Sequence, residues 1–569
     1  MLTKHKAFIV SFILFTQSSF ANYKDTIHHT NLATELDLRG LSVPTGNGIR
    51  VTQVESPFSG SGATNFMPNA ANSQFTGKTI TDQTGGGTAS SHGTTVGQNL
   101  YGNTTSMAPG ITDIDVYEAE DWLNNKGWLS GDPFVETNPL QNHSWVGFSS
   151  SNAATARMDY AVVRDGFLPI AGLYNSDYGI QEIPSNIPEI YGSMYNGITV
   201  GVSDGTHRTG ATSAADGPSR IKPEIVAPNS YTSFATPYVT AAAAMLIESA
   251  GVDADAKRQQ VVKAILLAAA DKTPFAGWDQ TTLRPLDDIY GAGQLDVYEG
   301  YFIQQAGKQI AGSTIDERGW NFASLGSGSS HTYNLFVPNG FILRNLSALI
   351  TWNRTVARTG RKFIIYTPNT LANLSLTLAQ QPSGITQTSN SPVDNIEHIW
   401  RDSSNALTAG NYTLTVATDL AGDYAIAWRS ELYQDYNAWA SVAFTTTPLT
   451  DQDPADDPDG DGILNLLEQA FGGDPEQSED SNILPISQTV TDGGNDYLEI
   501  SFRKPTFKSD LTYTVETVTD LNGTWTSIAS EVVLQAIQTE PGDFDRYVYR
   551  RVAPITDHEK AFLRVSVTQ

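Results

Sequence analysis

The chain has no cysteine among its 569 residues. Disulfides, thiol nucleophiles and cysteine-based metal sites are therefore excluded. Basic residues are also scarce: 34 Lys and Arg stand against 61 Asp and Glu, which gives a net charge of −27. Because such a surface repels phosphate groups, we expect neither nucleic acid nor an anionic membrane as a partner. An acidic surface is compatible with solubility and with divalent cations.

Long apolar segments are equally scarce, and no run beyond the N-terminus approaches the roughly 20 residues needed to span a bilayer. At the N-terminus, basic Lys4 and Lys6 precede an apolar stretch at 7–15, and small residues follow at 18–21. This order predicts a signal peptide over residues 1–21, and therefore export to the periplasm or the extracellular space. A buried N-terminal helix is the alternative. We expect the mature protein to be monomeric and not inserted in a membrane.

Residues 22–312 alternate strand-like and helical patterns. Buried strands are predicted at 163–173 and 197–202, and helices at 154–162 and 255–270. Alternating strands and helices predict an α/β fold, in which a parallel sheet carries helices on both faces.

The sequence changes character after this region. Residues 313–446 contain short alternating apolar runs separated by Gly, Asn and Ser, which is typical of a β-sandwich accessory domain. Residues 447–478 are rich in Asp, Pro and Gly and indicate an acidic linker. Strand-like runs return at 479–569 and predict a C-terminal β domain.

Ser233 lies just before an alanine-rich apolar stretch that predicts a buried helix. The first turn of such a helix carries free N–H groups and the positive end of its dipole. A serine at this place can be a helix cap, or a nucleophile whose developing oxyanion faces those N–H groups. Pro237 is expected to cost little so close to a helix start.

His92 begins a second predicted helix, in the segment S-S-H-G-T-T-V-G at 90–97. A lone histidine is more often structural than catalytic. A histidine that reaches a serine at a helix start is a candidate general base.

Five motifs follow one another along about 270 residues: H-G-T-T-V-G at 92–97, M-A-P-G-I-T-D-I-D-V-Y at 107–117, N-H-S-W-V-G at 142–147, I-K-P-E-I-V-A-P at 221–228 and T-S-F-A-T-P-Y-V at 232–239. In this order they resemble the motifs of the subtilisin-like serine proteases. The resemblance implies a subtilisin-like parallel sheet and a secreted serine endopeptidase. Such an enzyme hydrolyses protein or peptide substrates through an acyl-enzyme intermediate and needs no organic cofactor.

The resemblance also implies roles for single residues. Ser233 is the nucleophile, His92 the general base and Asn175 the side-chain donor to the oxyanion, although Asn175 could also be a turn residue. The acid should end the first strand, where Glu55 stands in place of the family's Asp. Glutamate can orient an imidazole, as it does in Ser-His-Glu hydrolases. A register two residues earlier would place Gln53 there, which cannot offset the imidazolium charge.

Other positions bear on the substrate cleft. Tyr174 occupies a position near the base of the P1 pocket where the family usually has Gly. The stretch 227–233 is shorter than usual. Only about thirty residues lie between Ala21 and the strand that ends at Glu55, too few for a foldase propeptide. The resemblance implies three further substrate-binding residues: Ser144, Trp145 and Val146.

Two alternatives stay open. One is a weak or inactive member of the fold that binds peptides in its cleft. The other is an adhesion protein that acts through its β domains. The related sedolisin type is disfavoured, because it uses a Glu base and an Asp at the oxyanion position, where this chain has His92 and Asn175.

The segment D-P-D-G-D-G-I-L-N-L-L-E at 457–468 has the twelve-residue spacing of an EF-hand calcium loop. It resembles the dockerin and thrombospondin-type-3 calcium segments of secreted proteins, and Ca²⁺ would be structural there. A disordered acidic linker is the alternative. The expected ligands are Asp457, Asp459, Asp461, Ile463 through its carbonyl group, Asn465 and Glu468.

Overall fold

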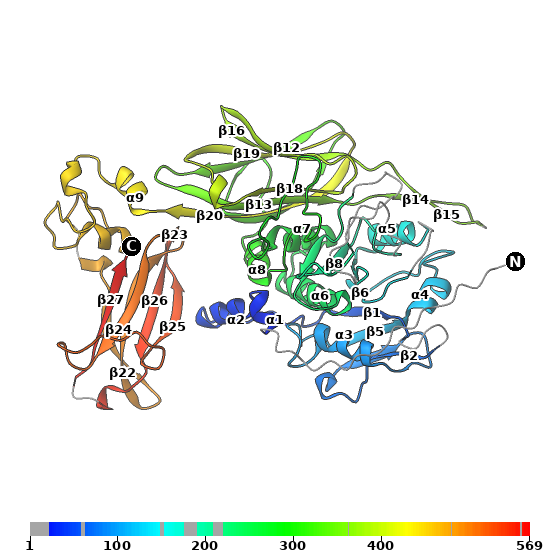
Figure 1. The fold of residues 1–569 in the computed structure, drawn as a ribbon, viewed down its shortest axis with the longest axis horizontal. Coiled ribbons are helices and arrows are strands. Elements are labelled where there is room, and N and C mark those ends of the chain that lie inside the picture. The colour runs from blue at the N-terminus through cyan, green and yellow to red at the C-terminus, as the bar shows by residue number, and fades with distance from the viewer. Residues whose placement is uncertain are drawn as a thin grey trace.

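The computed structural model describes residues 22–57, 63–147, 153–175, 190–208, 220–361, 363–478, 481–557 and 560–569. The predicted signal peptide, 1–21, lies outside these ranges. Figure 1 shows an α/β body, β-sheets layered above it and a C-terminal β domain at one end. Within the described ranges, no helix combines the length and apolar character needed to cross a membrane.

A seven-stranded parallel sheet forms the centre of the α/β body, in the order β3-β5-β1-β6-β7-β8-β9. Five of its strands, β1 and β6 to β9, are buried along their whole length, as expected for a parallel sheet covered on both faces. The strands are β1 Val51–Glu55, β3 Thr79–Asp82, β5 Asp113–Glu118, β6 Leu140–His143, β7 Leu168–Gly172, β8 Ile198–Val202 and β9 Ile225–Ala227. A small separate pair is formed by β2 Asn65–Met67 and β4 Thr88–Ala89.

Helices cover both faces of this sheet. On one face, α3 (Ser91–Tyr101), α6 (Thr232–Ser249), α7 (Gln259–Ala269) and α8 (Val297–Gln305) contribute to one hydrophobic cluster. On the other face, α4 (Ala119–Asn125) and α5 (Ala153–Asp165) contribute to a second cluster. Strand β1 contributes to both hydrophobic clusters, since Val51 belongs to the first and Val54 to the second. The predicted fold class, an α/β body followed by β domains, is confirmed.

The strand predicted at 163–173 begins later than expected. Helix α5 continues to Asp165, Gly166 adopts φ 81°, and β7 begins only at Leu168. A glycine in the left-handed region commonly ends a helix. The prediction therefore assigned the last turn of α5 to the strand.

Two five-stranded β-sheets follow the α/β body, in the orders β10-β12-β19-β16-β17 and β11-β20-β13-β18, with β23 added to β20. Residues from both sheets form one hydrophobic cluster between them, as in a β-sandwich. A hairpin of β14 Val356–Thr359 and β15 Ile365–Pro368 extends along α5. The remaining strands are β10 Thr314–Ile315, β11 Arg318–Leu325, β12 Ser330–Val337, β13 Ile342–Trp352, β16 Leu374–Gln381, β17 Gly384–Ser389, β18 Ile396–Arg401, β19 Gly410–Thr418, β20 Gly422–Gln434 and β23 Lys508–Ser509.

The sandwich shares a core with the α/β body. Leu349 of β13 and Ala427 of β20 belong to the same hydrophobic cluster as α7. Nearby, Glu224 Oε1 lies 2.5 Å from Lys222 Nζ and 3.1 Å from Lys263 Nζ, and these three side chains are only 1 % exposed. Apolar packing therefore joins the two parts, while the buried ionic cluster joins α7 to the segment that leads into β9 within the α/β body.

The C-terminal β domain contains the sheet β21-β22-β26-β25 and the pair β24–β27. Its strands are β21 Ile486–Asp492, β22 Asn495–Pro505, β24 Thr512–Val518, β25 Val532–Thr539, β26 Phe544–Arg551 and β27 Phe562–Thr568. Two helices precede it, α9 (Tyr436–Ala443) and α10 (Asn465–Phe471). Phe471 of α10 is buried in the core of this domain. Part of the segment predicted as a linker is therefore a component of the C-terminal fold.

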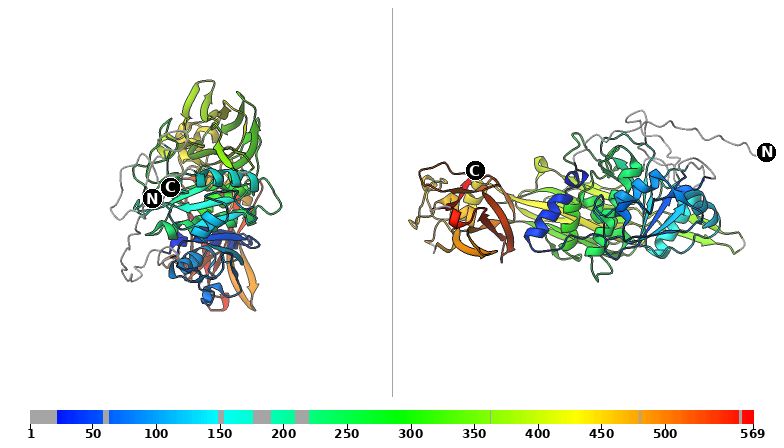
Figure 2. Two further views of the ribbon diagram at one scale, coloured as in Figure 1. Left: turned by 90° about the vertical axis from the view of Figure 1, so that its right-hand side faces the viewer. Right: turned by 90° about the horizontal axis from the view of Figure 1, so that it is seen from below.

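The N-terminal helices α1 (Tyr23–Thr26) and α2 (His29–Leu38) lie between the α/β body and the C-terminal domain (Figures 1 and 2). Arg39, directly after α2, forms an ion pair of 2.8 Å with Asp545 of β26. Tyr23 stacks on Tyr238 of α6, with ring centroids 3.9 Å apart. The N-terminal segment thus contacts two parts of the chain that are far apart in sequence.

Candidate active site and calcium loop

Ser233 is the second residue of α6, and its side chain is half-buried. The residue at the N-cap position is Tyr231, whose side chain makes no capping hydrogen bond. Ser233 is therefore inside the helix rather than its cap, contrary to the simpler alternative. Gly172 of β7 allows the start of α6 to approach the sheet, because a Cβ there would lie 2.8 Å from Thr236 Oγ1.

Pro237 is the sixth residue of α6, so the expectation that it lies among the first residues of the helix, with no N–H partner to lose, is wrong. Its missing N–H is the one that would have bonded to the carbonyl oxygen of Ser233. Ser144 supplies that hydrogen bond instead, since its hydroxyl donates to Ser233 O at 2.7 Å. Asn142 supports Ser144 by donating from Nδ2 to Ser144 Oγ at 2.9 Å.

Ser144 therefore has a different place from the one implied by the resemblance. It is 2 % exposed and holds the backbone at Ser233 rather than lining an open cleft. Trp145 and Val146 follow it and are half-buried. The indole N–H of Trp145 donates to His143 Nδ1 at 3.2 Å, and its ring packs on Tyr191.

The structure brings Glu55 and His92 together. Glu55 ends β1 and is fully buried, and His92 is the second residue of α3. His92 Nδ1 donates to Glu55 Oε2 at 2.8 Å. Gln53, the alternative in the other register, bonds to Glu55 at 2.9 Å and not to the imidazole.

The pKa of His92 reflects two opposed effects. Burial lowers it, whereas the charge of Glu55 and the hydrogen bond to Glu55 raise it, and the net result is a pKa above the ordinary histidine value. The imidazolium form is thus stabilised by its partner, as a general base requires once it has accepted a proton.

The imidazole lies close to the start of α6. Its ring centroid is 5.5 Å from that of Phe234, the residue after Ser233. On the same side, Asn99 Nδ2 of α3 donates to Phe234 O at 3.2 Å. Within the described part of the chain, no hydrogen bond links His92 to Ser233.

Asn175 is also tied to the start of α6. It follows β7, and its Oδ1 accepts from the backbone N–H of Thr232 at 2.8 Å and from the Thr232 hydroxyl at 3.1 Å. These bonds fix the amide plane next to Ser233. The preceding residue, Tyr174, has the guanidinium of Arg208 4.7 Å from its ring centroid.

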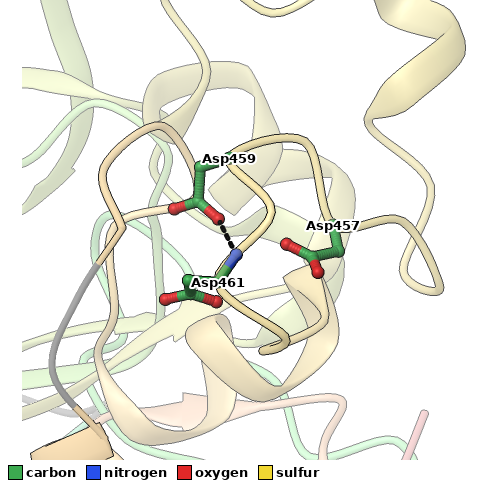
Figure 3. A group of neighbouring side chains, drawn as sticks. All are labelled: Asp457, Asp459 and Asp461. Carbon is green, nitrogen blue, oxygen red and sulfur yellow. Dashed lines mark hydrogen bonds between the residues drawn. The ribbon is translucent and has the colours of Figure 1, made fainter.

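The acidic loop before α10 gathers three of the six expected calcium ligands. One carboxylate oxygen each from Asp457, Asp459 and Asp461 lies within 4.8 Å of the others, and Figure 3 shows these side chains around the turn. Gly462 adopts φ 90°, and its N–H donates to Asp457 Oδ2 at 3.0 Å. Ile463 N–H donates to Asp461 Oδ1 at 2.7 Å, which holds that carboxylate in the loop.

The other two expected side-chain ligands are buried at the start of α10. Asn465 is fully buried and Glu468 is 1 % exposed, and neither belongs to the three-aspartate group. Asn465 Nδ2 donates to Asp453 O at 2.9 Å, while its Oδ1 is buried without a hydrogen-bond partner. Asp459 Oδ2 is likewise buried without one. Hard oxygen donors of this kind fit Ca²⁺.

The sequence did not reveal the supporting roles of four residues, although Gln53 and Ser144 were considered for other roles. Gln53 donates a hydrogen bond to Glu55, and Tyr101 donates one to Gln53. Ser144 replaces a helix hydrogen bond at Ser233, and Phe234 packs against the imidazole of His92. One signal was readable: residues two apart on a strand face the same way, which places Gln53 beside Glu55.

No protein-family model and no curated protein matches the chain. Among solved structures, it is similar to the prenylagaramide maturation protease PagA, with 18 % identity over 45 % of this chain and 93 % of that chain and a TM-score of 0.32. A protease from Pseudoalteromonas arctica shares 15 % identity over 48 % and 93 %, with a TM-score of 0.34. The self-cleaved protease domain of PatA shares 18 % over 47 % and 100 %, with a TM-score of 0.33. These scores carry no inference about activity.

Proposed function

We propose that this protein is a serine endopeptidase of the subtilisin-like type, with Ser233, His92 and Glu55 as its triad. The observation that carries the proposal is the Glu55–His92 pair, whose imidazole lies against the first turn of the helix that bears Ser233. A buried carboxylate on Nδ1 leaves Nε2 as the basic nitrogen, which is the tautomer a general base needs.

In the proposed mechanism, the Ser233 hydroxyl attacks the scissile carbonyl group while His92 Nε2 accepts its proton. The C–N bond then breaks, and His92 returns the proton to the leaving amine. Water then attacks the acyl-enzyme. His92 accepts a proton from this water and returns it to the Ser233 oxygen as the acyl group leaves. Glu55 stabilises the imidazolium that forms in each half-reaction.

The developing oxyanion would be held by two donors. Asn175 presents Nδ2 on the opposite end of an amide whose Oδ1 is fixed by Thr232. The N–H groups of the first turn of α6 add the positive end of a helix. Preorganised donors of this kind are worth roughly 10²–10³ in rate each, a value measured on subtilisin.

Hydrolysis of an unfolded protein such as reduced casein tests this proposal. The wild-type protein should release peptides, and the Ser233→Ala and His92→Ala variants should release none above background. Sensitivity to a sulfonyl fluoride would accompany the activity. Folded wild-type protein without any proteolysis would count against the proposal.

A second candidate is a peptide-binding protein with a weak or inactive site. The missing hydrogen bond between His92 and Ser233 in the described structure is the observation that favours it. Such bonds often tighten only when substrate binds. Peptide binding that persists unchanged in Ser233→Ala, without hydrolysis by the wild type, would favour this candidate.

We further propose that the loop at 457–468 binds one structural Ca²⁺. Asp457, Asp459 and Asp461 would hold it, and the buried oxygens of Asn465 and Asp459 that lack partners support the proposal. We also propose export, from the signal-peptide pattern of residues 1–21. We propose protein or peptide substrates as partners.

A further inference from the structure

The carboxylate of Glu55 is held on both sides by buried side chains. Its Oε2 accepts from His92, and its Oε1 accepts from Gln53 Nε2 at 2.9 Å. Gln53 Oε1 in turn accepts from the hydroxyl of Tyr101 at 2.7 Å. Gln53, Glu55 and Tyr101 are all fully buried. Four side chains therefore form one hydrogen-bonded chain that ends at the imidazole.

The backbone next to these four side chains contributes a hydrogen bond and leaves space for them. Gln53 Nε2 also donates to the carbonyl oxygen of Gly93 at 3.1 Å, one residue after the histidine. Gly97, one turn before Tyr101 on α3, leaves room for the phenol, since a Cβ at 97 would lie 2.5 Å from the Tyr101 hydroxyl oxygen. Both glycines of the H-G-T-T-V-G motif, Gly93 and Gly97, therefore lie next to these hydrogen-bonded side chains.

The direction of each hydrogen bond is fixed by chemistry. Burial, and then the charge of Glu55, raise the pKa of Tyr101 well above its ordinary value, so the phenol keeps its proton. It can donate only to the oxygen of the Gln53 amide. The amide nitrogen must then face the carboxylate, as a donor.

We propose that Gln53 and Tyr101 are positioning residues that allow a glutamate to serve as the acid of the triad. Glutamate has one more rotatable bond than aspartate, so more side-chain freedom must be removed before its carboxylate meets the imidazole. The bond from Gln53 removes that freedom, and the bond from Tyr101 fixes the amide. This inference rests on the proposed peptidase function.

Gln53 has a second effect on the same carboxylate. A buried carboxylate stays ionised only if hydrogen bonds replace its lost hydration. Without the donor, the Glu55–His92 pair would bind a proton more tightly. Loss of Gln53 should therefore raise the pKa of His92 and move the acidic limb of kcat/KM to higher pH.

The test uses the full-length protein with Gln53→Leu and Tyr101→Phe. For Gln53→Leu, kcat should fall roughly ten- to hundredfold, the effect of losing a hydrogen bond to a charged group, with little change in KM. Tyr101→Phe should show a smaller loss in the same direction. The titration of His92 is followed by NMR of histidine-labelled protein in a Ser233→Ala background, where it should move to higher pH.

Tyr333→Phe is the matched control, because it removes another buried phenol oxygen, in the sandwich. It should leave kcat and the His92 titration unchanged. A folded Gln53→Leu protein with wild-type kcat and wild-type titration would overturn the inference. If that variant does not fold, Tyr101→Phe decides by the same two readouts. If the wild type proves inactive, the proposed function fails alone, and the titration still decides whether Gln53 and Tyr101 position the pair.

Discussion

At the scale of single residues, the candidate site depends on side chains that replace hydrogen bonds missing from the backbone or from water. Glu55 is buried and its carboxylate accepts hydrogen bonds from His92 and Gln53. Ser233 has a carbonyl group that its own helix does not satisfy.

Glu55→Gln keeps the shape of the acid but removes its charge. We expect kcat to fall by about 10⁴-fold, the loss seen when a serine protease acid becomes an amide. Of the causes that set the pKa of His92, burial, which lowers it, would remain and the raising effect of Glu55 would be lost. The acidic limb of kcat/KM should therefore shift to lower pH, whereas in the wild type it lies above the ordinary histidine value of about 6.5. A pH–rate profile with an unchanged acidic limb would contradict this account of the pair.

Ser144→Ala removes the donor to Ser233 O and should destabilise the protein by about 1–3 kcal/mol, the cost of an unsatisfied buried carbonyl group. Pro237→Ala restores a backbone N–H at the position that can reach the same oxygen. Ser144→Ala should therefore cost less in the Pro237→Ala background. Chemical denaturation of the wild type, the two single variants and the double variant measures the coupling between the two positions. Additive effects on the free energy of unfolding would show that the Ser144 hydroxyl and the restored N–H of residue 237 do not compete for the Ser233 carbonyl group.

At the scale of elements, much of the fold was predictable because period and composition report burial. The helices at 153–165 and 259–269 and the strand at 198–202 follow apolar patterns that are readable without a structure. The order acid, histidine, serine also predicts Glu55, His92 and Ser233. The structure pairs Glu55 with His92 and places the imidazole near the start of α6, the helix that carries Ser233.

Two of the predictions that failed depended on contacts between distant segments. Nothing local shows that Ser144 reaches the carbonyl of Ser233, 89 residues later. Phe471 lies in a stretch whose acidic composition predicts a linker, yet it is buried by strands of the C-terminal domain that follow it in sequence. The end of α5 was misjudged because Val163 and Arg164 fit a strand as well as a helix.

The ionic cluster around Glu224 ties α7 to the rest of the core, and α7 also packs on the sandwich. Lys263→Met removes one of the two lysines and should cost about 3 kcal/mol, because it leaves the charge of a buried glutamate less compensated. Since the α/β body and the sandwich share this core, they should still unfold in one calorimetric transition at a lower Tm. Lys257→Met, at an exposed position, is the control and should leave Tm unchanged. Two separated transitions in the Lys263→Met variant would argue against a shared core.

At the scale of the whole molecule, the chain consists of an α/β body and sandwich that form one unit and a C-terminal β domain reached through the acidic loop and α10 (Figure 1). Among the described residues, the ion pair that joins the N-terminal segment to that domain is made by Arg39. Ile463 of the acidic loop and Phe471 of α10 are buried in the core of this domain, so calcium should act chiefly on the C-terminal domain.

We expect calcium to raise the Tm of the C-terminal domain and EDTA to lower it. A free calcium concentration of 100 times Kd would stabilise the domain by about 2.7 kcal/mol. Asp459→Ala should abolish this response, and Asp557→Ala, at an exposed position of the same domain, should retain it. Calorimetry with and without EDTA makes the comparison, and proteolytic activity per folded molecule should not change. An identical Tm in both conditions would contradict a structural calcium site.

The central claim is that Ser233 is a nucleophile activated by His92. Its most direct test is labelling of the purified protein with a fluorophosphonate probe, followed by peptide mapping, because the probe reacts with activated serines whatever the peptide specificity. The account predicts a phosphonylated Ser233 in the wild type and no label in Ser233→Ala or His92→Ala. A folded wild-type protein without label, or label on another serine, would contradict it.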